Sequence, residues 1–194
     1  MKRLLIISSL AAIAAIPAAA NAQAIPPAIV AVVDLDRVQT ECNACKTARS
    51  ALAAQATAEE NREKALAAPL QTEQQSLQTA VDALKGKEPD AALQARVKAF
   101  QTRAQNAQDE ATRGRQQLQR NQAYIAQQIQ AKLNPIYTQV MQRRGANVLV
   151  EQGATLAAAT SIDVTNDVLA ALNAALPSVQ TIAPAAPANK TQGR

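Results

Sequence analysis

Two cysteines, Cys42 and Cys45, have the Cys-x-x-Cys spacing of a redox dithiol. They lie at the predicted start of a helix that follows a predicted strand, a position that stabilises a thiolate. Three residues apart on a helix, their Cα atoms are about 5 Å from each other, a distance that a disulfide can span. Three interpretations stay open: a local structural disulfide, two unpaired or intermolecular thiols, and catalytic thiol exchange, which needs a βαβ framework that this sequence does not predict.

The 194 residues include no histidine. This absence removes the commonest general base near neutral pH and the commonest zinc ligand, so Ser or Cys triads that need an imidazole are excluded. With two cysteines, one chain cannot form a four-cysteine zinc site, although a site shared between chains or completed by carboxylates stays open. We expect no catalytic residue, no metal site and no cofactor, and predict that the protein is not an enzyme.

A cluster of basic side chains is the other feature of the sequence that could bind a partner. It consists of Lys85, Lys87, Arg96, Lys98 and Arg103. These residues lie within about three helical turns of a predicted turn, so they form either a basic tip for acidic clients and anionic lipid head groups or an ordinary solvated helix surface. Without residues 1–22 the chain has 18 basic and 15 acidic residues, a net charge of +3. Because no basic patch is studded with aromatic residues, we expect no nucleic-acid partner.

The composition favours long, thin helices over a thick core. Hydrophobic residues make up 48% of the chain, but 46 of them are alanines, against one Phe, two Tyr and no Trp. Burying a large aliphatic side chain contributes roughly 1.5–3 kcal/mol and a methyl group far less. Alanine, glutamine and leucine are good helix formers, so helix pairs packed along narrow seams suit this chain.

The N-terminus has the features of a cleaved export signal. Lys2 and Arg3 precede an apolar run, residues 4–16, and Ala20-Asn21-Ala22 is a small-x-small cleavage site. The alternative, a retained membrane anchor, would need about 20 apolar residues. We therefore expect a signal peptide over residues 1–22, a linker over 23–28 and, for a bacterial source, a mature protein in the periplasm.

The middle of the chain predicts an antiparallel helical hairpin arm over residues 41–140. A helical pattern runs from about residue 35 to 85, with Pro69 as the one potential breaker, and residues 85–90 supply a turn at the tip. Leu66, Leu70, Leu77, Val81 and Leu84 share a face on the outgoing helix. The return helix keeps a seven-residue spacing at Val97, Ala104, Ala111, Leu118 and Ile125, accompanied by Leu93, Phe100, Ala107, Gly114 and Asn121. Fifty residues span roughly 75 Å, so the arm must project.

The two ends of the chain predict a small β/α body, over residues 29–40 and 141–176. Residues 29–33 form an apolar strand, and a β-hairpin is expected with strands 147–151 and 155–158 around Gln152-Gly153. Thr165 is the expected N-cap of a last helix over 166–176, and Pro135 is expected to kink the return helix as it enters the body. Pro177 stops the last helix, and residues 177–194 are expected to be disordered.

Three strands leave exposed edges and little core, so oligomerisation is an attractive way to complete the body. The alternative is a monomeric sheet covered by the last helix. The residues expected in the oligomeric body are Val30, Val32, Val148, Val150 and Leu156. The fold class is thus mostly α with a small β body, in which a long helical hairpin projects from a small oligomeric β-barrel.

Four segments together resemble the Skp/OmpH family of periplasmic chaperones for outer-membrane proteins. They are Ile29 to Arg37 (IVAVVDLDR), Leu133 to Val140 (LNPIYTQV), Asn147 to Ala159 (NVLVEQGATLAAA) and Asp163 to Asn173 (DVTNDVLAALN). The resemblance implies a homotrimer whose strands combine into a central barrel, with three helical tentacles around a cavity. It also implies ATP-independent holding of unfolded outer-membrane proteins. Cys42 and Cys45 are not part of the family pattern.

Three classes of function follow from these observations: a holdase chaperone, a periplasmic coiled-coil adaptor and a thiol enzyme. The chaperone would bind many denatured β-barrel proteins and delay their aggregation, whereas the adaptor would bind one folded partner. An enzyme would show turnover that disappears in a Cys45→Ser variant. The family resemblance favours the chaperone, with unfolded outer-membrane proteins as its clients.

Overall fold

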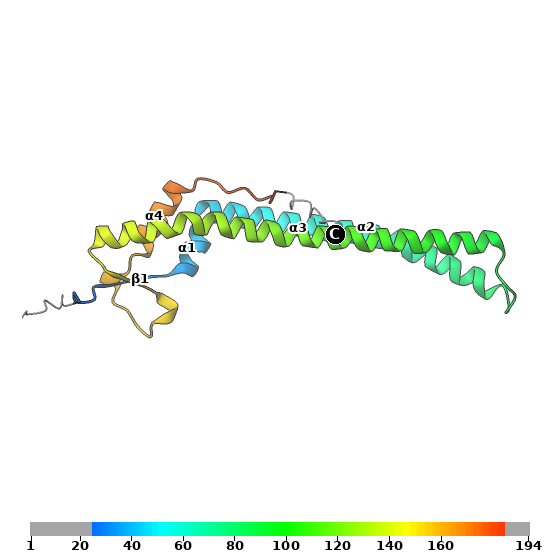
Figure 1. Cartoon of the computed structure of the whole chain (residues 1–194), viewed down its shortest axis with the longest axis horizontal. Coiled ribbons are helices and arrows are strands. Elements are labelled where there is room, and N and C mark those ends of the chain that lie inside the picture. The colour runs from blue at the N-terminus through cyan, green and yellow to red at the C-terminus, as the bar shows by residue number, and fades with distance from the viewer. Residues whose placement is uncertain (1–24, 185–194) are drawn as a thin grey trace, which may run out of the picture.

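The computed structural model describes residues 25–184 and is mostly helical, with a small two-stranded sheet at one end (Figure 1). This arrangement confirms the expected α-rich chain with a small β body. In chain order the elements are β1 (Val30–Val33), α1 (Leu35–Glu41), α2 (Asn43–Asp82), α3 (Ala91–Arg144), β2 (Val148–Glu151), the 3₁₀ turns η1 (Gln152–Ala154) and η2 (Thr160–Ile162), and α4 (Thr165–Ala175). The predicted signal peptide, residues 1–22, and residues 185–194 of the predicted disordered tail lie outside the described residues.

Helices α2 and α3 form the arm (Figure 1). Helix α3 has 54 residues, so it is about 80 Å long at 1.5 Å per residue. The turn between the two helices places Lys85 and Gly86 at φ values of 48° and 87°, and Asp90 caps α3 by accepting a hydrogen bond from the Leu93 N–H at 2.8 Å. Both helices continue through their internal prolines, Pro69 and Pro135. The chain thus leaves the body and returns to it along one antiparallel pair.

The seam between the two helices follows the predicted spacing on α3. Leu93, Asn121 and Ile125 are buried, and the other positions of that seam are partly buried. On α2, Leu77 is buried, but the predicted seam residue Val81 is 44% exposed. Val81 is the second-last residue of α2, and it stays partly exposed because it lines an open hollow beside Leu93 and Val97 of α3.

The predicted continuous helix from residue 35 to residue 85 is wrong at one point, because the backbone breaks at Cys42. Asp34 caps α1, its Oδ1 accepting from the Arg37 N–H at 2.8 Å. Cys42 then adopts extended angles, with φ −58° and ψ 132°, and α2 begins at Asn43. The side chain of Asn173, on α4, accepts a hydrogen bond from the Asn43 N–H at 2.8 Å. A contact 130 residues away therefore satisfies a backbone group that the break leaves free.

The sheet of the body pairs β1 with β2 in parallel, with Val30 opposite Val148 and Val33 opposite Glu151. The expected β-hairpin is wrong: after β2 the chain forms the turn η1, and residues 155–158 are not a strand in this chain. A two-residue hairpin turn requires positive φ values, and Gly153 does not have one. The long arm takes the place of the usual crossover helix between parallel strands.

The core of the body lies where α1, α4 and the base of α3 meet. Val38, Leu133, Val140, Val168 and Leu172 are almost completely buried there. The last helix starts one residue earlier than expected, because Thr165 is its first residue and does not cap it. Instead, Thr165 Oγ1 accepts from the Asp34 N–H at 2.9 Å, while Asp163 Oδ1 accepts from the Thr165 N–H at 2.8 Å. Thr165 thereby links α4 to the end of β1.

Residues 178–184, here named the tail segment, follow α4 and lie along the arm (Figure 1). Disorder was the expectation for all residues from 177 onward, and it is wrong for the tail segment. Its backbone forms hydrogen bonds with side chains of α2 and α3 instead of burying an apolar face of its own. Within residues 25–184, no helix combines the length and the apolar composition that crossing a bilayer requires.

Candidate functional site

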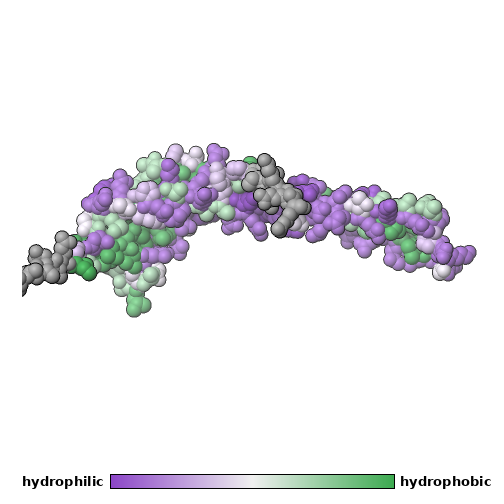
Figure 2. Space-filling view, in the orientation of Figure 1, coloured by the Kyte–Doolittle hydropathy of each residue, from purple (hydrophilic) through white to green (hydrophobic). Residues whose placement is uncertain are grey.

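The surface of the arm is mainly hydrophilic, whereas hydrophobic side chains gather at the body and in a smaller area toward the tip (Figure 2). Several shallow hollows line the seam, and two of them have aliphatic side chains from the outer half of the arm. One, of about 360 Å³, includes Leu66, Pro69 and Leu70. Another, of about 430 Å³ near the tip, includes Val81 and Leu93. The arm therefore offers small aliphatic contacts beside polar side chains.

Polar side chains hold the middle of the arm together. Asn121, only 3% exposed, donates from Nδ2 to Gln55 Oε1 at 2.7 Å across the seam. The Glu59 carboxylate packs directly over Gly114, where an added Cβ would overlap it. The absence of a side chain at Gly114 therefore leaves room for the Glu59 side chain against α3 at this level.

Ion pairs between α2 and α3 flank this polar section. Arg62 donates from Nε to Glu110 Oε1 at 2.9 Å, and Arg115 Nη1 contacts Glu63 Oε1 at 2.7 Å. The hydrogen bond and charge of Glu110 raise the pKa of Arg62 above its ordinary value. These pairs are exposed and so stabilise the arm only weakly, in a section where the seam between α2 and α3 has few buried apolar side chains.

The five basic residues predicted at the tip divide into two groups. Arg96 and Arg103 contact opposite oxygens of Glu73 on α2, at 3.8 and 3.4 Å. Lys85, Lys87 and Lys98 form no ion pair with any other residue in the range 25–184. The two arginines thus link α3 to α2, whereas the three lysines have no opposite charge in contact within residues 25–184.

The residues predicted for an oligomeric body lie in different environments. Val32 is buried within the chain, and Val150 is half-buried. Val30 and Val148 face each other across the sheet and are each 38% exposed, and Leu156 is fully exposed. The edge of β2 opposite β1 pairs with no strand among the described residues. Unpaired strand edges and exposed apolar side chains next to them are typical of surfaces that associate.

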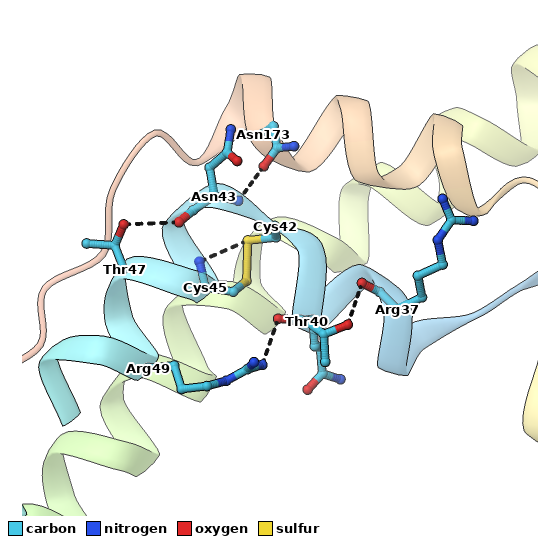
Figure 3. Close-up of a disulfide and its surroundings, with 9 residues drawn as sticks. Arg37, Thr40, Cys42, Asn43, Cys45, Thr47, Arg49 and Asn173 are labelled. Atoms are coloured by element: carbon cyan, nitrogen blue, oxygen red, sulfur yellow. Dashed lines mark hydrogen bonds between the residues drawn. A yellow bond between two sulfur atoms is a disulfide. The ribbon is translucent and has the colours of Figure 1, made fainter. Parts of the chain in front are cut away.

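A disulfide joins Cys42 and Cys45 at the break between α1 and α2 (Figure 3). Their Cα atoms lie 5.1 Å apart. Both residues are buried against the core of the body, with Cys42 completely inaccessible. Figure 3 shows the bridge enclosed between α1, α2 and the Asn173 end of α4. A buried bridge offers a poor target for an attacking thiolate, which argues against the catalytic alternative.

A family model described as "Outer membrane protein (OmpH-like)" matches residues 29–172. The chain belongs to the OmpH-like family. No curated protein matches the sequence. Among solved structures, the OmpH-like chain is similar to the "putative outer membrane chaperone (OmpH-like)" from Caulobacter crescentus CB15. The TM-score is 0.67 at 20% sequence identity, over 82% of this chain and 95% of the other, which shows a shared fold.

The surroundings of two titratable groups in the body of the OmpH-like chain shift their pKa values. Burial raises the pKa of Tyr137, and the nearby Glu151 charge adds to this increase. Hydrogen bonds from the side chain and backbone of Thr165 lower the pKa of Asp163. Within residues 25–184, no three His, Cys, Asp or Glu side chains gather closely enough to hold a metal ion. The pKa shifts of Tyr137 and Asp163 thus result from the packing and hydrogen bonding of the body.

Four amide side chains of the OmpH-like arm hold the tail segment: Gln55, Gln117, Asn121 and Gln128. The sequence pattern indicated only Asn121, as a polar position in the predicted seam. A signal was present in the many glutamines of the arm, but these residues are also ordinary on an exposed helix. Their role depends on a segment more than 50 residues away, so sequence spacing alone could not reveal it.

Proposed function

We propose that this chain is an ATP-independent periplasmic holdase that binds unfolded outer-membrane proteins between helical arms and prevents their aggregation. The observation that carries the proposal is the family match over residues 29–172 together with a long arm whose hollows are shallow. The OmpH-like structure from Caulobacter crescentus is described as that of an outer-membrane chaperone, which supports the same role. Client chains would meet many small contacts along the arm.

Shallow contacts are sufficient for a holdase because they act together. After the first contact, each further contact along the same unfolded chain is intramolecular, so overall affinity rises without a strong individual site. The aliphatic side chains at the two hollows and the amide side chains of the arm suit a client of variable sequence. The three unpaired tip lysines add attraction for acidic clients or anionic lipid head groups.

We further propose that three chains assemble through the body into a homotrimer with a small central barrel. The open edge of β2 and the exposed Val30, Val148 and Leu156 support this assembly, since association would cover them. The three arms would then surround a common cavity. Light scattering of the purified protein at micromolar concentration should give the mass of a trimer, and a monomer mass would contradict the assembly.

Export to the periplasm follows from the signal-like residues 1–22. Mass spectrometry of protein extracted from the periplasm should find Gln23 at the N-terminus. Intact Met1 on that protein would contradict export with cleavage.

The deciding experiment for the holdase is dilution of a urea-unfolded porin with and without the mature protein, followed by light scattering. The protein should suppress aggregation to the same extent with and without ATP. A requirement for nucleotide, or unchanged aggregation of the porin and other unfolded β-barrel proteins, would contradict the proposal. Capture of one folded partner in place of unfolded chains would establish the adaptor alternative.

A further inference from the structure

The tail segment is held on the arm by five hydrogen bonds. The Gln128 side chain donates to the Gln180 carbonyl and accepts from the Gln180 N–H, both at 2.9 Å. At Ala183, Asn121 Oδ1 accepts from the N–H at 2.8 Å and Gln117 Nε2 donates to the carbonyl at 3.3 Å. Gln55 Nε2 donates to the Thr181 carbonyl at 3.2 Å. Amide side chains from both helices thus bind the backbone of a non-helical segment that bends at Ile182.

All five of these hydrogen bonds use backbone atoms of the tail segment. At residues 180 and 183 both the N–H and the carbonyl are hydrogen-bonded, and the bend at Ile182 between them turns both residues toward the arm. Every non-proline residue carries the same N–H and carbonyl, so this mode of binding does not depend on sequence. The four amide side chains, which we name the amide groove, therefore fit the backbone of non-helical polypeptide in general.

The amide groove is organised by hydrogen bonds of its own. Asn121 is fixed by Gln55 across the seam and accepts from Gln117 Nε2 at 2.7 Å on the same helix. Arg120 in turn donates from Nη2 to the side-chain oxygen Oε1 of Gln117. Side chains oriented in this way lose little freedom when they bind a strand, which favours binding by a preformed surface.

The tail segment is attached loosely enough to leave. Its Ile182 side chain, beside a hollow of about 340 Å³, stays 69% exposed, and Val179 is partly buried against the core. Hydrogen bonds between polar groups that water can also satisfy contribute little net free energy each. An unfolded chain with suitable extended segments can therefore compete with the tail for the same groups.

We propose that the amide groove is a binding site for non-helical polypeptide backbone, and that the tail segment occupies it until a segment of unfolded client displaces it. This inference rests on the holdase function proposed above. A chain segment with free N–H and carbonyl groups at positions three residues apart, and a bend between them, would fit. The tail thus acts as an internal competitor that lowers the affinity of the resting chaperone.

The tail's own backbone provides the test. Replacing Gln180 and Ala183 together with proline removes the two N–H groups that Gln128 and Asn121 accept from. The matched control, Gln180→Ala with Ala183→Ser, changes the same side chains and keeps both N–H groups. If the tail occupies the groove about 90% of the time, its release raises apparent affinity for client about tenfold. Both variants should keep the helical content of the wild type, since neither residue is in a helix.

Affinity for a urea-unfolded, fluorescently labelled porin is the first measurement. We expect the proline variant to bind about tenfold more tightly than the wild type and the control variant to match the wild type within about twofold. Adding Gln128→Ala to the proline variant should reduce this gain. Adding Gln127→Ala should not, because the exposed Gln127 side chain makes no hydrogen bond within the described residues.

Hydrogen exchange of the full wild-type chain is the second measurement. Backbone amides of Gln180 and Ala183 should be protected at rest and should exchange faster when porin is added. Equal porin affinity of the proline variant and the wild type, or unchanged exchange on porin binding, would overturn the inference while leaving the holdase function intact. If no variant binds porin at all, the holdase proposal itself fails.

Discussion

Replacing Lys85, Lys87 and Lys98 together with glutamine should slow the capture of acidic unfolded clients. These side chains form no ion pair within residues 25–184, so their charge is available to a partner. Arg96 and Arg103 are left in place because both contact Glu73. Replacing them would weaken the contact between α2 and α3 as well as lower the positive charge at the tip.

The size of the effect follows from charge and screening. Two unit charges about 10 Å apart in water interact by about 0.4 kcal/mol, and screening over about 8 Å at physiological salt reduces this to about 0.1 kcal/mol. Three lysines acting on a client segment with two or three negative charges give about 0.7–1 kcal/mol in total. Capture should therefore slow about three- to fivefold, whereas release should change less.

Stopped-flow fluorescence of a labelled, unfolded porin would measure capture at several salt concentrations. The matched control replaces Lys46, Lys132 and Arg143 with glutamine, which removes the same charge from exposed positions at the body end of the arm. We expect the difference between wild type and tip variant to shrink as salt rises. An equal slowing by both triple variants would show that net charge, not the tip, steers the client. An unchanged capture rate for the tip variant at low salt would refute the tip's role.

Three further predictions concern the body. Leu172→Ala, at a fully buried position, should lower the free energy of unfolding by about 2–5 kcal/mol in urea titrations followed by circular dichroism, and Ile25→Ala, at a position 93% exposed and outside the proposed assembly surface, should change it little; similar losses would contradict the assigned core. Reducing the disulfide, which closes a loop with a separation of 3, should cost at most about 2 kcal/mol, and two titratable thiols in the unfolded, non-reduced protein would show that the bridge is absent. Because the pKa of Asp163 is lowered from 3.8 in the folded state, its contribution to stability is present above pH 3.8 and is lost as pH falls through the folded pKa; acid titration of Asp163→Asn should lack that loss, and an unchanged acid profile would argue against it.

The sequence by itself determined the parts of the molecule that depend on neighbouring residues. Seven-residue spacing along the return helix set its buried seam, and Lys85-Gly86 with the Asp90 cap set the turn between the helices. Local sequence patterns also predicted the position of β1 and the end of the last helix before Pro177. These features follow from backbone preferences and side-chain periodicity within a few turns, so no tertiary contact was needed to predict them.

Tertiary structure alone decided the features that join distant parts of the chain. The break at Cys42 contains no proline or glycine and is completed by Asn173 from α4. β2 pairs with β1 in place of a local hairpin because the arm returns the chain beside a strand 118 residues earlier in the sequence. The tail segment is ordered because the pairing of α2 with α3 places amide side chains within hydrogen-bond distance of its backbone at Gln180, Thr181 and Ala183. Donors and acceptors on separate elements come within hydrogen-bond distance only after those elements have packed together. The spacing of residues within one element therefore cannot predict which groups will bond to each other.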